Sequence, residues 1–262
     1  MTERPFDALR RALHDISPEP NHHTPHSRPD AQRQARAGAP EIIFAAGKEP
    51  DHVLANLVTL AKENGRAIAT RCPEGLADYL AERLPAGYAL TTVARARAVV
   101  VAREGCSPPR IGGRVGILTA GTSDAPVAAE AELVARELGC ETRIAFDVGV
   151  AGLHRLVAPL EAMTEWDADV LIVVAGMDGA LPSVVAGLVA VPVIGVPTST
   201  GYGYGGRGEG ALMTMLQTCA PGLVVVNIDN GVGAGISAAL IANRVAAREG
   251  RDSATGSGQE SG

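Results

Sequence analysis

The second half of the chain alternates short apolar runs with longer segments in which apolar residues recur every three or four positions. The apolar runs predict strands at residues 114–121, 141–146, 169–176, 191–199 and 222–228. The periodic segments predict helices at residues 125–138, 152–165, 181–189, 208–219 and 234–248. Because the runs are apolar throughout, we expect strands that are covered on both faces. The succession predicts an α/β fold with a doubly wound, flavodoxin-like parallel sheet.

The first half of the chain repeats this alternation on a smaller scale. Strands are predicted at residues 41–46, 67–72 and 97–103, and helices at residues 49–65 and 75–84. Pro108 and Pro109 then interrupt both kinds of pattern, so we place a linker there. A small α/β domain at residues 41–107 is therefore expected to precede a larger domain at residues 111–248.

The two ends of the chain lack such patterning. Residues 1–40 contain one predicted amphipathic helix, at residues 5–17, followed by a Pro-, His- and Arg-rich stretch that we interpret as a mobile linker. Three histidines in this stretch could bind a metal ion, although a solvated linker is the favoured interpretation; they are His22, His23 and His26. Residues 249–262 are predicted to form a disordered tail.

Composition and charge narrow the class of protein. Hydrophobic residues make up 46% of the 262 residues and aromatic residues only 3%, which favours a core of small aliphatic side chains between parallel α/β layers. The formal net charge of −6 argues against nucleic acid or a membrane surface as a partner. The N-terminus has no signal-like apolar segment and no run approaches the roughly 20 apolar residues of a membrane-spanning helix. A cytoplasmic protein is therefore expected.

Several motifs for cofactors and catalysis are missing from the larger domain. No lysine follows residue 110, which excludes a Walker A lysine and a Schiff-base lysine there, and no GxSxG elbow is present. Formal GxGxxG-like matches at residues 201–206 and 233–238 lack the strand–turn–helix context of a dinucleotide fingerprint. We expect no organic cofactor.

Polar residues and glycines follow every predicted strand of the larger domain, at the edge where such sheets bind ligands. The candidate binding residues are Gly121, Thr122, Ser123, Asp124, Asp147, Arg155, Gly176, Met177, Gly179, Ser199, Gly201, Asp229 and Asn230. Backbone N–H groups of the first loop could bind phosphate, and Arg155 could hold phosphate as a fork. Acidic residues follow four of the five strands, which suggests contacts with ribose hydroxyls or a divalent cation.

Each of these residues also has an ordinary structural explanation. Asp124 can cap a helix, Asp178 fits a turn beside glycine, and His154 at a helix start can be structural rather than catalytic. Cys219 stands between a predicted helix and the last strand. By residue type alone it is more readily a buried core cysteine than a nucleophile. The other cysteines, Cys72, Cys106 and Cys140, show neither CxxC nor zinc-ligand spacing and are interpreted as structural, free thiols.

Four segments together resemble the LarB family of nickel-pincer nucleotide cofactor biosynthesis proteins. They are GILTAGTSDAPVAAEA, FDVGVAGLHRL, VAGMDGALPSVVAGLVAVPVIGVPTS and VVNIDNGVGAG. The resemblance covers nearly all of residues 112–245, and residues 41–105 fit that family's layout. The larger domain also resembles PurE, the aminoimidazole ribonucleotide carboxylase and mutase, on Ser123-Asp124 and His154-Arg155. The fold class expected is thus a PurE/flavodoxin-like sheet preceded by a small α/β domain.

The LarB resemblance implies a reaction. Nicotinic acid adenine dinucleotide would be carboxylated at ring carbon 5 with CO2 as co-substrate, and its phosphoanhydride hydrolysed to give pyridinium-3,5-biscarboxylic acid mononucleotide and AMP. Cys219 occupies the place of the cysteine that attacks the pyridinium in this family. Asp178 stands where the family usually has Glu, one methylene longer, and is implied as a catalytic residue for hydrolysis and a candidate Mg²⁺ ligand. His154, Asp147 and the substrate's own groups are candidates for the base that removes the ring proton.

Two other functions stay open. One is a PurE-type aminoimidazole ribonucleotide carboxylase or mutase, whose chemistry needs no cysteine, and the other is a nucleotide-binding protein without catalysis. Small residues on the last helices and the PurE resemblance imply a homo-oligomer, such as an octamer of dimers that share sites.

Overall fold

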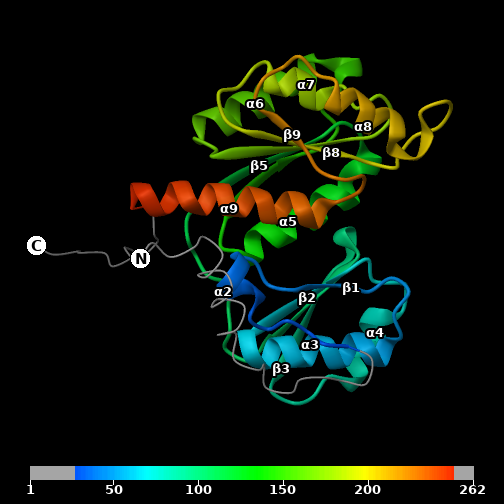
Figure 1. Ribbon diagram of the computed structural model, residues 1–262, viewed down its shortest axis with the longest axis vertical. Helices are drawn as coiled ribbons and strands as arrows, with labels where there is room; N and C mark the ends of the chain where they lie inside the picture. The colour runs from blue at the N-terminus through cyan, green and yellow to red at the C-terminus, as the bar shows by residue number, and fades with distance from the viewer. Residues whose placement is uncertain (1–26, 251–262) are drawn as a thin grey trace, which may run out of the picture.

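The computed structural model describes residues 27–250, which form two α/β units, one above the other in Figure 1. The upper unit contains a five-stranded sheet and the lower unit a four-stranded sheet. The predicted helix at residues 5–17, the three histidines of the linker and most of the predicted tail lie outside the described residues. No helix within residues 27–250 is long and apolar enough to cross a membrane.

The five-stranded sheet confirms the predicted doubly wound topology. Its strands are β5 (Arg114–Thr119), β6 (Glu141–Ala145), β7 (Val170–Ala175), β8 (Val193–Pro197) and β9 (Leu223–Val225). They lie in the order β6-β5-β7-β8-β9, and every neighbouring pair is parallel. This is the flavodoxin-like order, in which the chain reverses direction across the sheet beside the first strand.

Helices cover both faces of this sheet. On one face lie α5 (Ala125–Glu137) and α9 (Gly231–Glu249); on the other lie α6 (His154–Glu165), α7 (Leu181–Ala186) and α8 (Glu209–Leu216). Alternate side chains of β7 enter the two resulting cores: Ile172 packs with α5 and α9, whereas Val173 packs with α6, α7 and α8. Burial on both faces explains why the strands are apolar without alternation.

The four-stranded sheet of the N-terminal unit is mixed. Its order is β1 (Ile42–Phe44), β2 (Arg66–Thr70), β4 (Ala98–Arg103) and β3 (Tyr88–Val93), with β1 parallel to β2 and the other pairs antiparallel. The helices α3 (Pro50–Asn64) and α4 (Leu76–Arg83) form where they were predicted. The sequence interpretation did not include β3. This strand pairs only with β4 and is half exposed, so its apolar pattern is weak.

Part of the segment predicted to be a mobile linker is folded. Residues Arg33–Ala37 form the short helix α2, which ends at Gly38 in the left-handed conformation. Ala31 and Ala39 on either side of α2 are buried. The prediction for residues 27–40 therefore needs correction, because small apolar residues within this polar stretch pack against the rest of the protein.

Helix α5 of the larger unit packs against the sheet of the N-terminal unit. A small apolar cluster joins Leu133 of α5 to Ile68 of β2 and Val100 of β4. At its end, both carboxylate oxygens of Glu137 accept hydrogen bonds of 2.7 Å from Arg66 of β2. The units are thus joined by apolar packing and by a bidentate ion pair.

Candidate active site

The loops that follow the five parallel strands meet at the carboxyl edge of the sheet, and Asp124 lies at their centre. Its side chain is 3% exposed and accepts hydrogen bonds from the Gly121 N–H at 2.9 Å and from the Thr198 hydroxyl at 2.7 Å. The backbone of Gly176 also bonds to this carboxylate. Burial raises the pKa of Asp124, and the nearby charge of Asp229 adds to the effect. Asp124 therefore ties together the loops after β5, β7 and β8.

Asp229 makes a second connection between loops. Its carboxylate accepts a hydrogen bond of 2.8 Å from the Ser199 N–H, and its own N–H donates to the Pro197 carbonyl at 2.8 Å. The next residue, Asn230, caps α9 by accepting a hydrogen bond from Gly233 at 2.8 Å. The loops after β8 and β9 are therefore held side by side.

The loop after β6 presents a charged pair to solvent. The Asp147 carboxylate lies 2.6 Å from the Arg155 guanidinium, and both side chains are exposed. His154, the first residue of α6, is also exposed. The loop after β6 and the first turn of α6 thus bring these three predicted residues together, and Asp147 holds the Arg155 guanidinium.

Close backbone packing explains the glycines after β7. A Cβ atom on Gly176 would lie 2.2 Å from the Thr200 carbonyl oxygen, and one on Gly179 would lie 2.6 Å from the backbone of Ala211. Between them the Met177 N–H donates to the Thr200 carbonyl at 2.8 Å. The Asp178 carboxylate is exposed and accepts a hydrogen bond of 3.3 Å from the Ala180 N–H. The loop thus presents one carboxylate to solvent beside a tightly packed backbone.

The remaining predicted residues lie on the same edge. Thr122 and Ser123 belong to the short 3-10 helix that precedes α5, and the Ser123 carbonyl accepts a hydrogen bond of 3.5 Å from Thr200. Gly201 follows at the start of the glycine-rich loop and lies against Met177. Every predicted binding residue is therefore on this edge of the sheet.

The described residues contain no group of three or more His, Cys, Asp or Glu side chains placed to hold a metal ion. Asp178 supplies one carboxylate, which already accepts a backbone hydrogen bond. Mg²⁺ can bind through one carboxylate and substrate phosphates, so Mg²⁺ at Asp178 stays a prediction and enters no step below.

Cys219 lies at the opposite edge of the sheet. It is exposed and stands between the end of α8 and the start of β9, where the Gly222 carbonyl already bonds to Val193 at the beginning of β8. The four residue steps of β8 alone separate the two edges by roughly 13 Å. The structure therefore does not bring Cys219 together with the loop residues of its own chain.

The other cysteines differ from Cys219. Burial raises the pKa of Cys72 to about 11 and that of Cys140 to about 12. Cys140 also donates to the Asn243 side-chain oxygen at 3.3 Å. Both are therefore structural thiols, as expected for buried cysteines.

Sequence reasoning missed three residues of this region. Thr198 binds Asp124, whereas Arg71 and Glu130 form an ion pair of 3.2 Å beside Asp229. Thr198 directly follows β8 and could have been found from its position. Arg71 comes from the N-terminal unit, so no pattern within the larger domain points to it.

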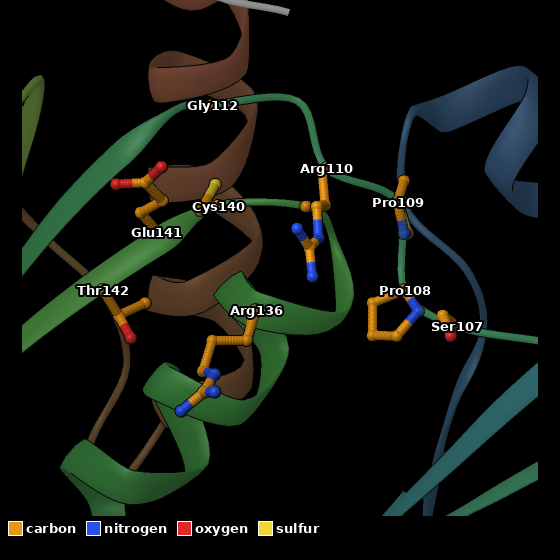
Figure 2. A pocket seen from close by; sticks show the side chains of 10 residues that line it. Ser107, Pro108, Pro109, Arg110, Gly112, Arg136, Cys140, Glu141 and Thr142 are labelled. Atoms are coloured by element: carbon orange, nitrogen blue, oxygen red, sulfur yellow. The ribbon is translucent and has the colours of Figure 1, made fainter. Parts of the chain in front are cut away.

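Two cavities lie at opposite edges of the five-stranded sheet. The larger, about 600 Å³, lies at the amino edge of the sheet, between the linker and the start of β6, and contains none of the predicted residues (Figure 2). The second, about 450 Å³, lies between the two units and includes Asp229 and Asn230 in its lining. Only the second is continuous with the carboxyl edge.

Comparison with known proteins finds a matching family model for each unit. A LarB/PurE-like N-terminal domain model matches residues 22–103, and an AIR carboxylase model matches residues 114–255. An uncharacterized protein of Methanocaldococcus jannaschii is 46% identical over 215 residues, which cover 81% of this chain and 82% of that protein.

Relatives with a named activity match about half of this chain. The N5-carboxyaminoimidazole ribonucleotide mutase of M. jannaschii is 34% identical over 50% of this chain and 77% of its own length. That of Thermotoga maritima is 33% identical over 49% of this chain and 74% of its own length. With its loop network at the carboxyl edge and a family match that covers more than half of its residues, this chain belongs to the AIR carboxylase family.

Proposed function

We propose that this protein is a carboxylase of LarB type, which carboxylates the pyridinium ring of nicotinic acid adenine dinucleotide and hydrolyses its phosphoanhydride. Its membership of the AIR carboxylase family supports a carboxylase-related function. The observation that carries the finer assignment is the union of this domain with a LarB/PurE-like N-terminal domain in one chain. The exposed thiol of Cys219 adds a nucleophile that imidazole carboxylation does not need.

The proposed chemistry uses the thiolate of Cys219 to make the ring electron-rich. The pyridinium ring and CO2 are both electrophiles and do not react with each other. Addition of sulfur to ring carbon 4 forms a C–S bond and moves an electron pair to the ring nitrogen, which gives an enamine. Carbon 5 of this enamine attacks CO2. Loss of the carbon 5 proton to a base and departure of the thiolate restore the aromatic ring. Cysteine suits these steps because sulfur both adds and leaves readily.

The second reaction is hydrolysis of the phosphoanhydride. Water attacks phosphorus, the bridging P–O bond breaks, and AMP and the dicarboxylated mononucleotide separate. The exposed carboxylate of Asp178 lies at the edge of the sheet and is the proposed group that orients this water. Asp178→Asn should therefore slow AMP release more than formation of the cysteine adduct. A quenched-flow assay measures AMP release, and intact-protein mass spectrometry measures the adduct. If Asp178→Asn slows both equally, Asp178 has no role specific to hydrolysis.

The position of Cys219 requires a site built from two copies of the chain. Cys219 and the loop residues lie at opposite edges of the sheet in one chain, whereas the proposed reaction needs them at one ring. We therefore place Cys219 of a second copy beside these loops. Exposed apolar side chains on α8 and β9, the two elements that flank Cys219, favour such a contact, because exposed apolar surface often marks an interface between chains. They are Met213, Leu216 and Val224.

A direct assay tests the proposed function. The purified protein is incubated with nicotinic acid adenine dinucleotide and bicarbonate, and AMP and a dicarboxylated mononucleotide are measured by chromatography with mass spectrometry. Cys219→Ala should abolish carboxylation and the covalent adduct, whereas Cys106→Ala should change neither. A Cys219→Ala protein that turns over normally would exclude the covalent mechanism.

The second candidate is carboxylation of aminoimidazole ribonucleotide or the mutase reaction on its N5-carboxy form. The relatives named N5-carboxyaminoimidazole ribonucleotide mutase favour it. Turnover of a carboxyaminoimidazole ribonucleotide, together with no reaction on the dinucleotide, would select it. Tight dinucleotide binding without either product would instead indicate a binding protein without catalysis.

A further inference from the structure

The cavity between the two units lies where the carboxyl ends of three strands meet. In the N-terminal unit, β1 ends at Phe44 and β2 at Thr70, and both residues line the cavity. The opposite wall comes from the segment after β9 and from the helices α5 and α9, which separate the sheets in Figure 1. The full lining is Ile42, Phe44, Thr70, Arg71, Glu130, Asn227, Ile228, Asp229, Asn230 and Val232. Carboxyl ends of strands are where α/β sheets bind ligands.

Arg71 fixes the two walls relative to each other. Its backbone is left-handed, with φ of 54°, and its guanidinium reaches across to the larger unit. There it donates to Glu130 at 3.2 Å and to the carbonyl oxygen of Asp229. Glu130 is 2% exposed, and Thr70 also bonds to it. The two walls are therefore held together by the pairing of half-buried Arg71 with buried Glu130, and one wall is the loop that binds Ser199.

The lining suits a flat, neutral ring attached to a sugar. Phe44 is 56% exposed and offers an aromatic surface for stacking. The side-chain oxygens of Asn227 and Asn230 already accept hydrogen bonds from the Ile228 and Gly233 N–H groups, and their NH2 groups can donate to the ring nitrogens of a purine base. The volume of about 450 Å³ is in the range of small-molecule sites.

The charges argue against a cationic ring in this cavity. The ammonium of Lys48 lies 5.9 Å from the centre of the Phe44 ring and donates a hydrogen bond to the Phe44 carbonyl. A pyridinium stacked on Phe44 would be repelled by this ammonium, whereas a neutral base carries no charge to be repelled. Arg71 is paired with Glu130, and Asp229 adds a second carboxylate to the lining, so Lys48 is the group proposed to attract a phosphate on the sugar.

We propose that the cavity between the units binds an adenosine-type nucleotide, as the half of the dinucleotide that is not carboxylated. The claim that this cavity takes part in turnover rests on the proposed function. The pyridinium half then occupies the loops after β5, β6 and β7, and the N-terminal unit supplies the binding surface for the rest of the substrate.

Titration calorimetry with AMP and adenosine as probes tests the cavity directly. Phe44→Ala should weaken the binding of both about tenfold, as expected for loss of one base–aromatic stack. Phe44→Tyr keeps the ring and should bind AMP as the wild type does. Because Phe44 is exposed, neither variant should lose the fold, which circular dichroism checks. The binding of nicotinic acid mononucleotide should be the same in all three proteins.

The outcomes separate this proposal from the proposed function. If the wild type binds neither AMP nor adenosine, or if Phe44→Ala weakens the mononucleotide instead of AMP, the assignment of the cavity is wrong. If AMP binding depends on Phe44 but the dinucleotide is never carboxylated, the cavity assignment stands and the proposed function fails. If turnover occurs, Phe44→Ala should raise KM for the dinucleotide about tenfold with kcat unchanged.

Discussion

Some residues other than glycine at the carboxyl edge adopt the left-handed backbone conformation. Asp147, Met177 and Asp229 each follow a strand and have φ values of 58°, 48° and 57°. Such conformations cost energy for residues other than glycine. In each case the N–H bonds to a fixed acceptor, on Thr119, Thr200 and Pro197 respectively. Strain of this kind is found at binding and catalytic sites, and Asp167 at the amino edge shares it with a φ of 59°.

Asp124 is the residue on which the loops depend most, and its substitution has a defined cost. It accepts hydrogen bonds from the Gly121 and Gly176 backbones and from the Thr198 hydroxyl, and an amide at this position offers one acceptor oxygen where the carboxylate offers two. Asp124→Asn should therefore lower the free energy of unfolding by about 1–3 kcal/mol at neutral pH. Urea denaturation measures this. An unchanged midpoint would show that the network contributes nothing to stability.

The pH dependence of Asp124 has a definite sign. Burial raises its pKa above the ordinary 3.8, so the folded protein holds this proton more tightly than the unfolded chain does. The stability from this group is present below about pH 3.8 and is lost as the pH rises through the folded pKa. The stability advantage of the wild type over Asp124→Asn should accordingly be larger near pH 4 than at neutral pH, where the loss of about 1–3 kcal/mol applies.

At the scale of elements, β7 and β8 are joined by the close approach of the loops that follow them. Gly176→Ala would place a methyl group 2.2 Å from the Thr200 carbonyl oxygen, and one of the two loops must move. We expect a loss of about 1–3 kcal/mol in stability and a loss of substrate binding. Gly206→Ala is the matched control, because a Cβ there meets no atom within 4 Å. Equal effects of the two changes on the unfolding midpoint would contradict this account.

Much of the fold was predictable because parallel strands buried on both faces leave long apolar runs, as in β7 and β8. The half-exposed β3 and the short α2 leave no such pattern. The loop residues were predictable from topology, since the carboxyl ends of parallel strands share one edge. Arg71 was not, because its partners lie 59 and 158 residues away in the chain. The same topology places Cys219 at the other edge, since it precedes a strand.

At the scale of the whole molecule, the contact between the units includes a bidentate ion pair. Glu137 is 9% exposed, so Arg66→Met would leave a buried carboxylate without this partner. The expected loss is about 1–3 kcal/mol, measured by thermal or urea unfolding. Arg83→Met removes an ion pair with a single hydrogen bond, to Glu82, from an exposed position and should cost less than about 0.5 kcal/mol. Similar costs for both would mean that Arg66 does not hold the units together.

A complementation experiment tests whether one site combines Cys219 of one chain with the loop residues of another. A Cys219→Ala chain and a His154→Ala chain are each expected to be inactive in the proposed reaction. Co-expression of the two should restore roughly a quarter of wild-type activity, since a site that combines two chains can draw an intact loop from one and an intact thiol from the other. Activity no higher than that of either parent, in a preparation shown to contain mixed oligomers, would place Cys219 and the loops of one chain at the same site.

The location of Cys219 at the far end of its own sheet has a consequence for how this protein behaves on dilution. Under the proposed two-chain site, a solitary subunit would carry both the thiol and the loop residues, at opposite edges of its sheet, and would be inert. Specific activity would then fall with protein concentration once assemblies begin to dissociate.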